Sequence, residues 1–275
     1  MTRMETFAVQ DMPQPFFDLA WHVFFASRGR GVSLDVHFPW LRGGGRNDRA
    51  WCLTDNAGRP AAMLVVREGL IRDAEGMMPF HAIGVVCTTP EQERRGYASQ
   101  LIEAILNELG PDVPVLLWTS QHAFYARFGF APIDPTIVVD CDLTALPTVG
   151  GAIDEGAWES GRSKLFGGEV GLPTFVEGVR RFQAAGSAAS LLLSMTPRPT
   201  IIHMDARAAD AASAILELGI DRLLVNLPRE GSLIHELERS GIAVTVRPTN
   251  IAMWRPGRCD PDRIARLDIG LVERF

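Results

Sequence analysis

Thr89-Pro90-Glu91-Gln92-Glu93-Arg94-Arg95-Gly96-Tyr97-Ala98 joins two runs of sequence that have different periodicities. Residues 80–88 before it are nearly all apolar, which predicts a central strand covered on both faces. After it, apolar residues recur at helical spacing over 98–109, which predicts a helix with one buried face, and Gly110-Pro111 ends that helix. The quoted segment therefore connects a buried strand directly to a helix.

Such a junction is suited to binding an anion. The first backbone N–H groups of a helix have no acceptor within the helix, and they lie at the positive end of its dipole. Arg94 and Arg95 add positive charge, while Gly96 and the small Ala98 let an anion approach the backbone closely. The junction predicts a phosphate or pyrophosphate site, although taken alone the same residues also fit a solvated loop.

Around this junction, the first half of the chain alternates strand-like and helical segments, the pattern of an α/β or α+β domain. We expect a strand at 6–10, a helix at 14–27, a hairpin of strands at 49–54 and 61–67, a strand at 113–118, a short helix at 121–128 and a returning strand at 130–139.

The second half is similar in pattern. Glycines are frequent and periodicity is weak between residues 142 and 173, so we place the connection there and predict two domains, 1–145 and 146–275. Residues 106–112 are echoed by 216–221, which suggests a duplicated half-fold at an offset of about 110 residues. We expect strands at 190–195, 200–204 and 222–227, helices at 207–218 and 232–239, and a strand pair at 243–254.

Composition limits the classes of partner. The chain of 275 residues is 47% apolar with a net charge of −6 and no basic block, so we expect no nucleic-acid partner. Its apolar runs are far shorter than the ~18 residues that span a bilayer, and no signal-type segment follows Met1, so we expect a cytoplasmic protein without membrane contact. Four scattered cysteines predict neither disulfides nor a metal site.

A second motif, Ala123-Phe124-Tyr125-Ala126-Arg127-Phe128-Gly129-Phe130, lies one strand further on. Together the two motifs resemble the GCN5-related N-acetyltransferase (GNAT) superfamily, in which a strand enters a Gln/Arg-x-x-Gly-x-Gly/Ala loop and a later helix carries Phe-Tyr-x-x-x-Gly-Phe. The second motif matches in full, whereas Glu93 stands where the family prefers Gln or Arg. The resemblance covers about residues 5–140. It implies an α+β fold with a mixed central sheet flanked by helices, followed by a second, smaller GNAT-like α/β domain.

The resemblance also implies a cofactor. Acetyl-coenzyme A (acetyl-CoA) would lie between two splayed parallel strands, 80–88 and 113–118. Its pantetheine arm would bond to the backbone of Val86, Cys87 and Thr88 as if it were an added strand. Its pyrophosphate would lie on Arg94, Arg95, Gly96, Tyr97, Ala98 and Ser99. The thiol of Cys87 is expected to be a small buried side chain rather than a reactant.

Acyl transfer to an amine needs an unprotonated amine, stabilisation of the oxyanion and a proton for the departing thiolate. In the family the tyrosine of the second motif is often the acid, which is Tyr125 here, and a usual pKa of about 10 keeps it protonated. A main-chain N–H near Val86 or Cys87 would stabilise the oxyanion. For the base, His81 is the best nearby group. Strand alternation puts His81 and Cys87 on one face, a relation that a bulge would reverse.

Several other groups compete for the role of base. A water chain, Glu68, Glu75, Asp35 or His37 could serve instead, and the alternative for His122 is that it only begins a helix.

The second half lacks this machinery. Residues 203–210 contain no glycine, and Leu237 falls opposite Tyr125 when Gly241 is set against Gly129. If the repeat is real, the second unit would be a degenerate GNAT-like module that completes the acceptor pocket or a dimer interface.

The sequence therefore predicts an N-acetyltransferase that transfers an acetyl group from acetyl-CoA by direct attack of an amine in a ternary complex. The acceptor is a small-molecule or peptidyl amine, and the acidic balance weakly favours cationic ones. The alternative hypothesis is a non-catalytic acyl-CoA-binding sensor or scaffold protein. A homodimer is compatible with the sequence, which does not specify the oligomeric state.

Overall fold

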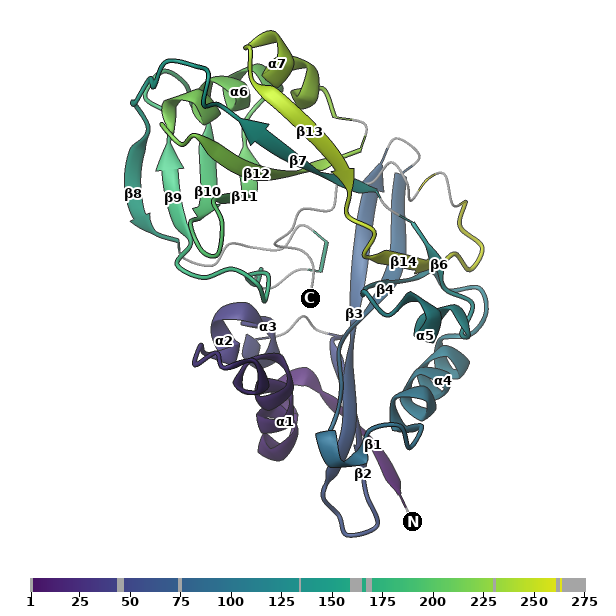
Figure 1. The fold of residues 1–275 in the computed structure, drawn as a ribbon. Helices are drawn as coiled ribbons and strands as arrows, with labels where there is room; N and C mark the ends of the chain where they lie inside the picture. Colours follow the sequence, from purple (N-terminus) through teal and green to yellow (C-terminus); the bar gives the residue numbers. More distant parts are fainter. Residues whose placement is uncertain are drawn as a thin grey trace.

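The computed structural model describes residues 2–43, 47–73, 76–133, 135–158, 165–166, 170–229, 231–260 and 263. Within them the chain forms two seven-stranded mixed sheets, each with helices packed against it (Figure 1).

The first sheet has the order β1-β2-β3-β4-β5-β14-β6. Its strands are β1 (Arg3–Ala8), β2 (Arg49–Thr54), β3 (Pro60–Asp73), β4 (Gly76–Thr88), β5 (Val115–Trp118), β6 (Ala131–Pro132) and β14 (Ala252–Arg255). Its helices are α1 (Gln14–Phe24), α2 (Leu34–His37), α3 (Trp40–Gly43), α4 (Tyr97–Leu109) and α5 (His122–Ala126), with short 3-10 turns at Val9–Asp11, Ala26–Arg28 and Pro90–Gln92.

The two faces of this sheet have separate cores. On one face the apolar stripe of α4, including Leu101, Ile102 and Ile105, packs with Tyr125 of α5 against β2–β5. On the other face α1, α2 and α3 pack against alternate residues of β2, β3 and β4. The helix predicted after the quoted segment is therefore present, and its apolar stripe is the buried side.

The second sheet has the order β13-β7-β12-β11-β10-β9-β8. Its strands are β7 (Thr136–Asp142), β8 (Ile153–Ala157), β9 (Arg180–Gln183), β10 (Ser190–Ser194), β11 (Thr200–Asp205), β12 (Arg222–Pro228) and β13 (Ala243–Pro248). Two helices, α6 (Ala208–Glu217) and α7 (Leu233–Arg239), cover one of its faces.

The two sheets repeat one topology. Read from the opposite end, the second sheet runs β8-β9-β10-β11-β12-β7-β13, which parallels β1-β2-β3-β4-β5-β14-β6 strand for strand. Among the described residues, the only parallel pair of each sheet is β4–β5 or its counterpart β11–β12. The last strand of each half, β7 or β14, lies in the sheet of the other half. The duplication suggested by the sequence is thus visible in the strand order, with an exchange of strands that the sequence did not indicate.

This exchange corrects two expectations. Residues 130–139 do not form one returning strand, because β6 ends at Pro132 and the chain crosses to the second sheet before β7 begins at Thr136. Pro132 and Pro135 flank the crossing and lack the N–H that a continuous ladder needs. Residues 243–254 likewise do not pair with each other, since β13 bonds to β7 while β14 bonds to β5 and β6.

The segment 170–177 joins the second half to the first. The buried His37 ring holds it, with Nδ1 3.2 Å from the carbonyl oxygens of both Leu172 and Pro173, so Nδ1 carries the proton and donates. Arg30 forms an ion pair of 2.6 Å with Glu177. Helix α2 and the loop after α1 therefore fix the position of this segment between the two sheets.

No helix in the described part of the chain is both long enough and apolar enough to cross a membrane.

Candidate active site

The first sheet contains a fork between its two parallel strands. Strands β4 and β5 pair only at His81–Val115, Ala82–Leu116 and Ile83–Leu117. Beyond Ile83 the edge of β4 that faces β5 has no strand partner among the described residues. The expectation of two splayed parallel strands therefore has a structural counterpart at β4 and β5.

A bulge lies in β4 just beyond the start of the fork. The register with β3 shifts between Met63 and Val65, and Val85 has a φ of 52°. A β-branched residue in this region costs about 1–3 kcal/mol, and such strain is often found at functional sites. The bulge places Val85 and Cys87 on the α1 face, whereas Val86 packs with the α4 core.

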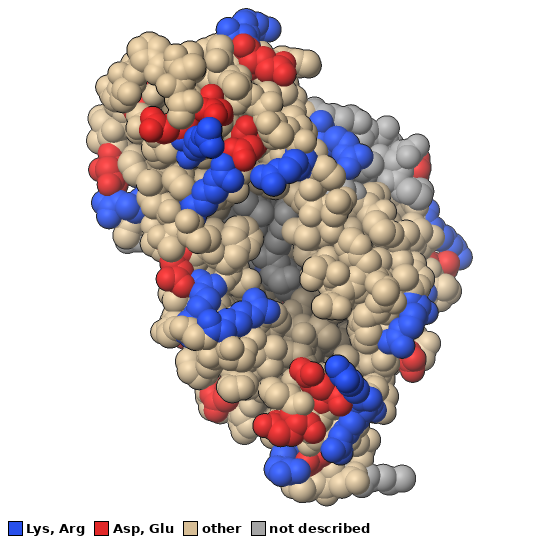
Figure 2. Space-filling model, in the orientation of Figure 1, with Lys and Arg blue, Asp and Glu red and all other residues tan. Residues whose placement is uncertain are grey.

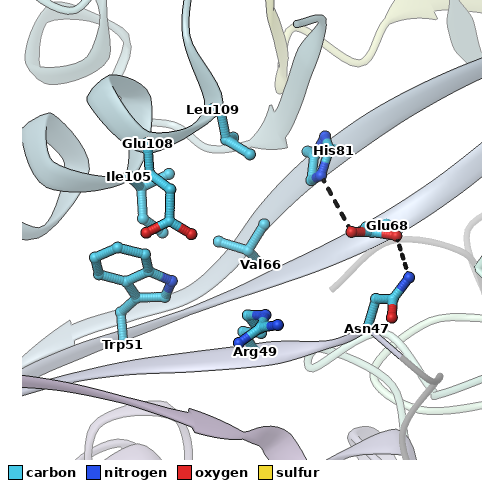
Figure 3. Close-up of a pocket in the computed structure, with 9 residues that line it drawn as sticks. All are labelled: Asn47, Arg49, Trp51, Val66, Glu68, His81, Ile105, Glu108 and Leu109. Carbon is cyan, nitrogen blue, oxygen red and sulfur yellow. Dashed lines mark hydrogen bonds and ion pairs between the residues drawn. The ribbon is translucent and has the colours of Figure 1, made fainter.

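The bulge separates His81 from Cys87. His81 lies on the α4 face, in a pocket of about 60 Å³ near the end of α4 (Figure 3). Its Nε2 is 3.7 Å from a carboxylate oxygen of Glu68, which in turn accepts a hydrogen bond from Asn47. Burial lowers the pKa of His81, and the Glu68 charge opposes that shift. The imidazole is thus neutral at neutral pH, but no predicted cofactor-binding residue and no part of Tyr125 lines its pocket.

The loop after β4 is rich in unpaired donors. No described residue accepts a hydrogen bond from the backbone N–H groups of Arg94–Ser99, which lie at the beginning of α4. Arg94 and Gly96 both have left-handed backbone, with φ of 62° and 83°. Alternating left- and right-handed residues turn successive N–H groups toward one concavity. We call residues Glu93–Ser99 the anion loop.

Charges around the anion loop are mainly positive. Arg94 and Arg95 are exposed, and neither forms an ion pair with a described residue. Glu93 is exposed as well. Arg127, from the second motif, extends from the end of α5 to within 3.3 Å of the Ser99 hydroxyl. We predicted no role for Arg127 from the sequence, and its contact with Ser99 brings a third guanidinium to the beginning of α4.

The turn between β2 and β3 is hydrogen-bonded to the 3-10 turn that precedes the anion loop. Gln92 is buried and donates a hydrogen bond of 2.8 Å to Asp55. The same carboxylate accepts hydrogen bonds from the backbone and side chain of Arg59, which hold the pKa of Asp55 well below its usual range. Asp55 is therefore ionised at neutral pH, and it fixes the 3-10 turn that precedes the loop.

Tyr125 lies in the core beside the fork. Its ring packs edge-on against Phe124 and Phe130, with centroids 4.9 and 6.1 Å away, and only 7% of the residue is exposed. Burial raises its pKa to about 12. The hydroxyl forms no hydrogen bond with a described residue. It is also not among the fully buried polar atoms of those residues that lack a partner, so its oxygen is in contact with solvent. Tyr125 can therefore donate a proton at any physiological pH.

The other groups considered as a base are differently placed. His122 begins α5 one turn before Tyr125, and its Nε2 is buried without a partner in the described residues. His37 holds the segment 170–177, and Asp35 pairs with Arg42 at 3.2 Å. Glu75 lies outside the described residues.

The buried cysteines are not reactive groups. Burial raises the pKa of Cys52 and Cys141 to about 12 and raises that of Cys87 as well. Because the thiolate is the nucleophile, these thiols are inert at neutral pH. This environment fits the expectation that Cys87 is a small buried side chain rather than a reactant.

Comparisons with known proteins match part of the chain to a family model and most of it to solved folds. Residues 60–133, which run from β3 to the end of β6, match the family model described as an acetyltransferase (GNAT) domain. A search of curated proteins gave no match.

Solved structures share the fold over most of the chain. A probable N-acyltransferase of Enterococcus faecalis V583 is 12% identical with a TM-score of 0.63, covering 92% of this chain and 72% of that one. Eis1 of Mycobacterium abscessus is 15% identical with a TM-score of 0.61, covering 97% and 76%. A GCN5-related N-acetyltransferase of Anabaena variabilis is 11% identical with a TM-score of 0.61, covering 92% and 72%. At such low sequence identity, the likeness to these structures shows the fold alone. It confirms the fold class that the resemblance implied.

Proposed function

We propose that this chain, which carries a GNAT acetyltransferase domain, transfers an acetyl group from acetyl-CoA to an amine by direct attack. The observation that carries the proposal is the anion loop, whose unpaired N–H groups and left-handed Gly96 lie beside the open edge of β4. A diphosphate is the ligand that such a concavity fits.

The residues present fit the pyrophosphate and the pantetheine arm of acetyl-CoA. Arg94–Ser99 would bond the pyrophosphate, helped by the guanidinium of Arg127. The edge of β4 that faces β5, along Val86, Cys87 and Thr88, would bond the pantetheine arm in the fork. Acetyl-CoA would supply a thioester, whose carbonyl carbon is open to attack by an amine.

The chemical step then uses few side chains. The amine nitrogen bonds to the thioester carbon, the C–S bond breaks, and the Tyr125 hydroxyl gives its proton to the departing sulfur. A backbone N–H at the β4 bulge, near Val86 or Cys87, would stabilise the negative charge that develops on the acyl oxygen. The proton lost by the amine restores Tyr125 to its neutral form, which burial strongly favours.

Two histidines, His81 and His122, are alternative candidates for the base that removes the proton of the amine. His81 is neutral but occupies the separate pocket of Figure 3, whereas His122 shares a helix with Tyr125. Separate substitution of each by glutamine assigns the role, because only loss of the base should remove the acidic limb of the rate profile.

A matched pair of glycine variants tests the cofactor site. Gly96 and Gly29 both have left-handed backbone, with φ and ψ of 83° and 5° against 70° and 18°, and a Cβ at either would meet nothing within 4 Å. Alanine should therefore cost each about 1–2 kcal/mol of folding stability. Only Gly96→Ala places a methyl group in the anion loop, so only it should weaken acetyl-CoA binding, by about tenfold or more. Equal acetyl-CoA affinity of the two variants would remove the loop from the proposal.

Turnover is tested by thiol release from acetyl-CoA over a panel of amines. Release that depends on the amine supports an acetyltransferase. Acetyl-CoA binding without release for any amine would instead support an acyl-CoA sensor.

A further inference from the structure

A cavity of about 390 Å³ lies on the second sheet, and it is of the size that small-molecule sites have. It opens on the face away from α6 and α7, because those helices pack on the alternate residues of β7 and β12. In Figure 2 basic side chains border the central hollow on the side of the second sheet. The lining combines apolar Phe175, Leu224 and Ile251 with polar Arg198, Asn226 and Arg247.

The charge on this lining is positive. Arg198 is 2.7 Å from one oxygen of Asp140, and Arg247 is 3.7 Å from the other. Two guanidiniums therefore share one carboxylate, which leaves a net charge of one positive unit. The remaining N–H donors of both arginines have no acceptor among the described residues. A planar anion such as a carboxylate is the partner that these donors fit.

The cavity adjoins the end of β5. Ile251, which lines it, accepts a hydrogen bond of 2.6 Å from the backbone N–H of Thr119, the residue after β5. On its other side Phe175 belongs to the segment that His37 holds against α2. The anion loop begins α4, on the opposite face of the first sheet. A donor bound at the loop and an acceptor bound in the cavity would therefore approach the fork from different sides.

We propose that this cavity is the acceptor site and that it selects amines that also carry an anionic group on an apolar body, such as ω-amino carboxylic acids. The inference rests on the proposed function. Arg198 and Arg247 would hold the anionic group, the apolar lining would cover the body, and the amine would extend toward β5. The local charge is thus opposite in sign to the net charge of −6.

Binding is measured first, without acetyl-CoA or an amine. Calorimetry on the full chain compares 4-phenylbutyrate with its neutral analogue 4-phenylbutanamide. We expect the acid to bind about two- to fivefold more tightly, the range for exposed charge pairs. Arg198→Gln or Arg247→Gln should remove this difference, while Asp140→Asn should increase it by freeing both guanidiniums. Equal affinity of acid and amide in the unsubstituted chain would overturn the inference.

Arg222→Gln is the matched control. Arg222 pairs with Asp142 on the same sheet at 2.8 Å but does not line the cavity. Arg222→Gln removes one positive charge, as Arg247→Gln does, but outside the cavity. It should therefore leave the difference in affinity between acid and amide unchanged. A loss as large as that of Arg247→Gln would mean that the preference comes from overall charge, against the inference.

Turnover then separates the inference from the function on which it rests. We compare 6-aminohexanoate with 6-aminohexanamide in the thiol-release assay and expect a higher kcat/KM for the acid, lost in Arg247→Gln. Release with both amines and no preference overturns the acceptor assignment and leaves the acetyltransferase proposal standing. Arginine-dependent binding of 4-phenylbutyrate without release for any amine supports the anion site and overturns the proposed function.

Discussion

The exchanged strand β14 makes the first sheet depend on residues far along the chain. Trp254 is 2% exposed and packs in one core with Phe80, Ala82 and Leu116 of β4 and β5. Its neighbour Met253 is fully buried and packs with the α4 core. We therefore predict that Trp254→Ala destabilises the unit that contains the anion loop, although the substitution lies more than 150 residues from that loop.

The expected size follows from the burial. Replacing a fully buried tryptophan by alanine costs about 3–5 kcal/mol, through lost transfer free energy and the cavity left behind. The indole Nε1 is buried without a partner among the described residues, so no hydrogen bond adds to that cost. Because domains are stable by only about 5–15 kcal/mol, the loss is a large part of the total.

Hydrogen exchange locates the effect. We expect Trp254→Ala to raise amide exchange in β4 and β5. The control is Ile215→Ala, a fully buried residue of α6, which should raise exchange in β11 and β12. A fragment of residues 1–145 lacks β14 and should not bind acetyl-CoA. Acetyl-CoA binding by that fragment as tight as by the full chain would refute the prediction. So would a Trp254→Ala variant that raises exchange in the second sheet and leaves β4 and β5 protected.

Three further outcomes are expected. Tyr125→Phe should lower kcat about 100-fold or more and change KM for acetyl-CoA little, since it removes only the proton donor. Burial raises the pKa of Tyr125 to about 12, so activity that depends on this phenol should persist above about pH 10, where an ordinary tyrosine ionises. Gly171→Ala should lower the urea midpoint, because a Cβ there collides with the backbone oxygen of His37, whereas a Cβ at Gly150 meets nothing and serves as the control. Of the four thiols, only that of Cys259 should react quickly with a disulfide reagent at pH 8, since the other three are buried with raised pKa, and more than one fast thiol would contradict their burial.

Local features of the site were predictable because they depend on short stretches of sequence. The apolar run, the glycine of the loop and the stripe of α4 together specify a strand, a left-handed turn and a helix. The bulge at Val85 was not predictable, since valine is a residue of regular strands and nothing in its neighbours indicates positive φ. The contact of Arg127 with Ser99 was missed for a related reason, because it joins two helices 28 positions apart.

The exchange of β7 and β14 could not be predicted from periodicity. Both strands have patterns that fit either sheet, and the choice depends on which edge the crossing segment reaches. Pro132 and Pro135 mark the interruption in the sequence, although we predicted 130–139 as one strand. The observed crossing also means that the two sheets do not divide the chain at one point.

The repeated topology shows why the fold alone does not assign the chemistry. The junctions β4–α4 and β11–α6 occupy equivalent places in the two sheets. The first has the left-handed Gly96 as the N-cap, with unpaired donors around it. At the second, the N-cap is Arg207 in an extended conformation, and its side chain pairs with Asp210 at 2.9 Å. A carboxylate of the chain itself thus lies in the first turn of α6, where an anionic ligand would have to bind. We therefore expect acetyl-CoA to bind at the first junction alone, whereas the proposed acceptor cavity lies on the opposite face of the second sheet, away from α6.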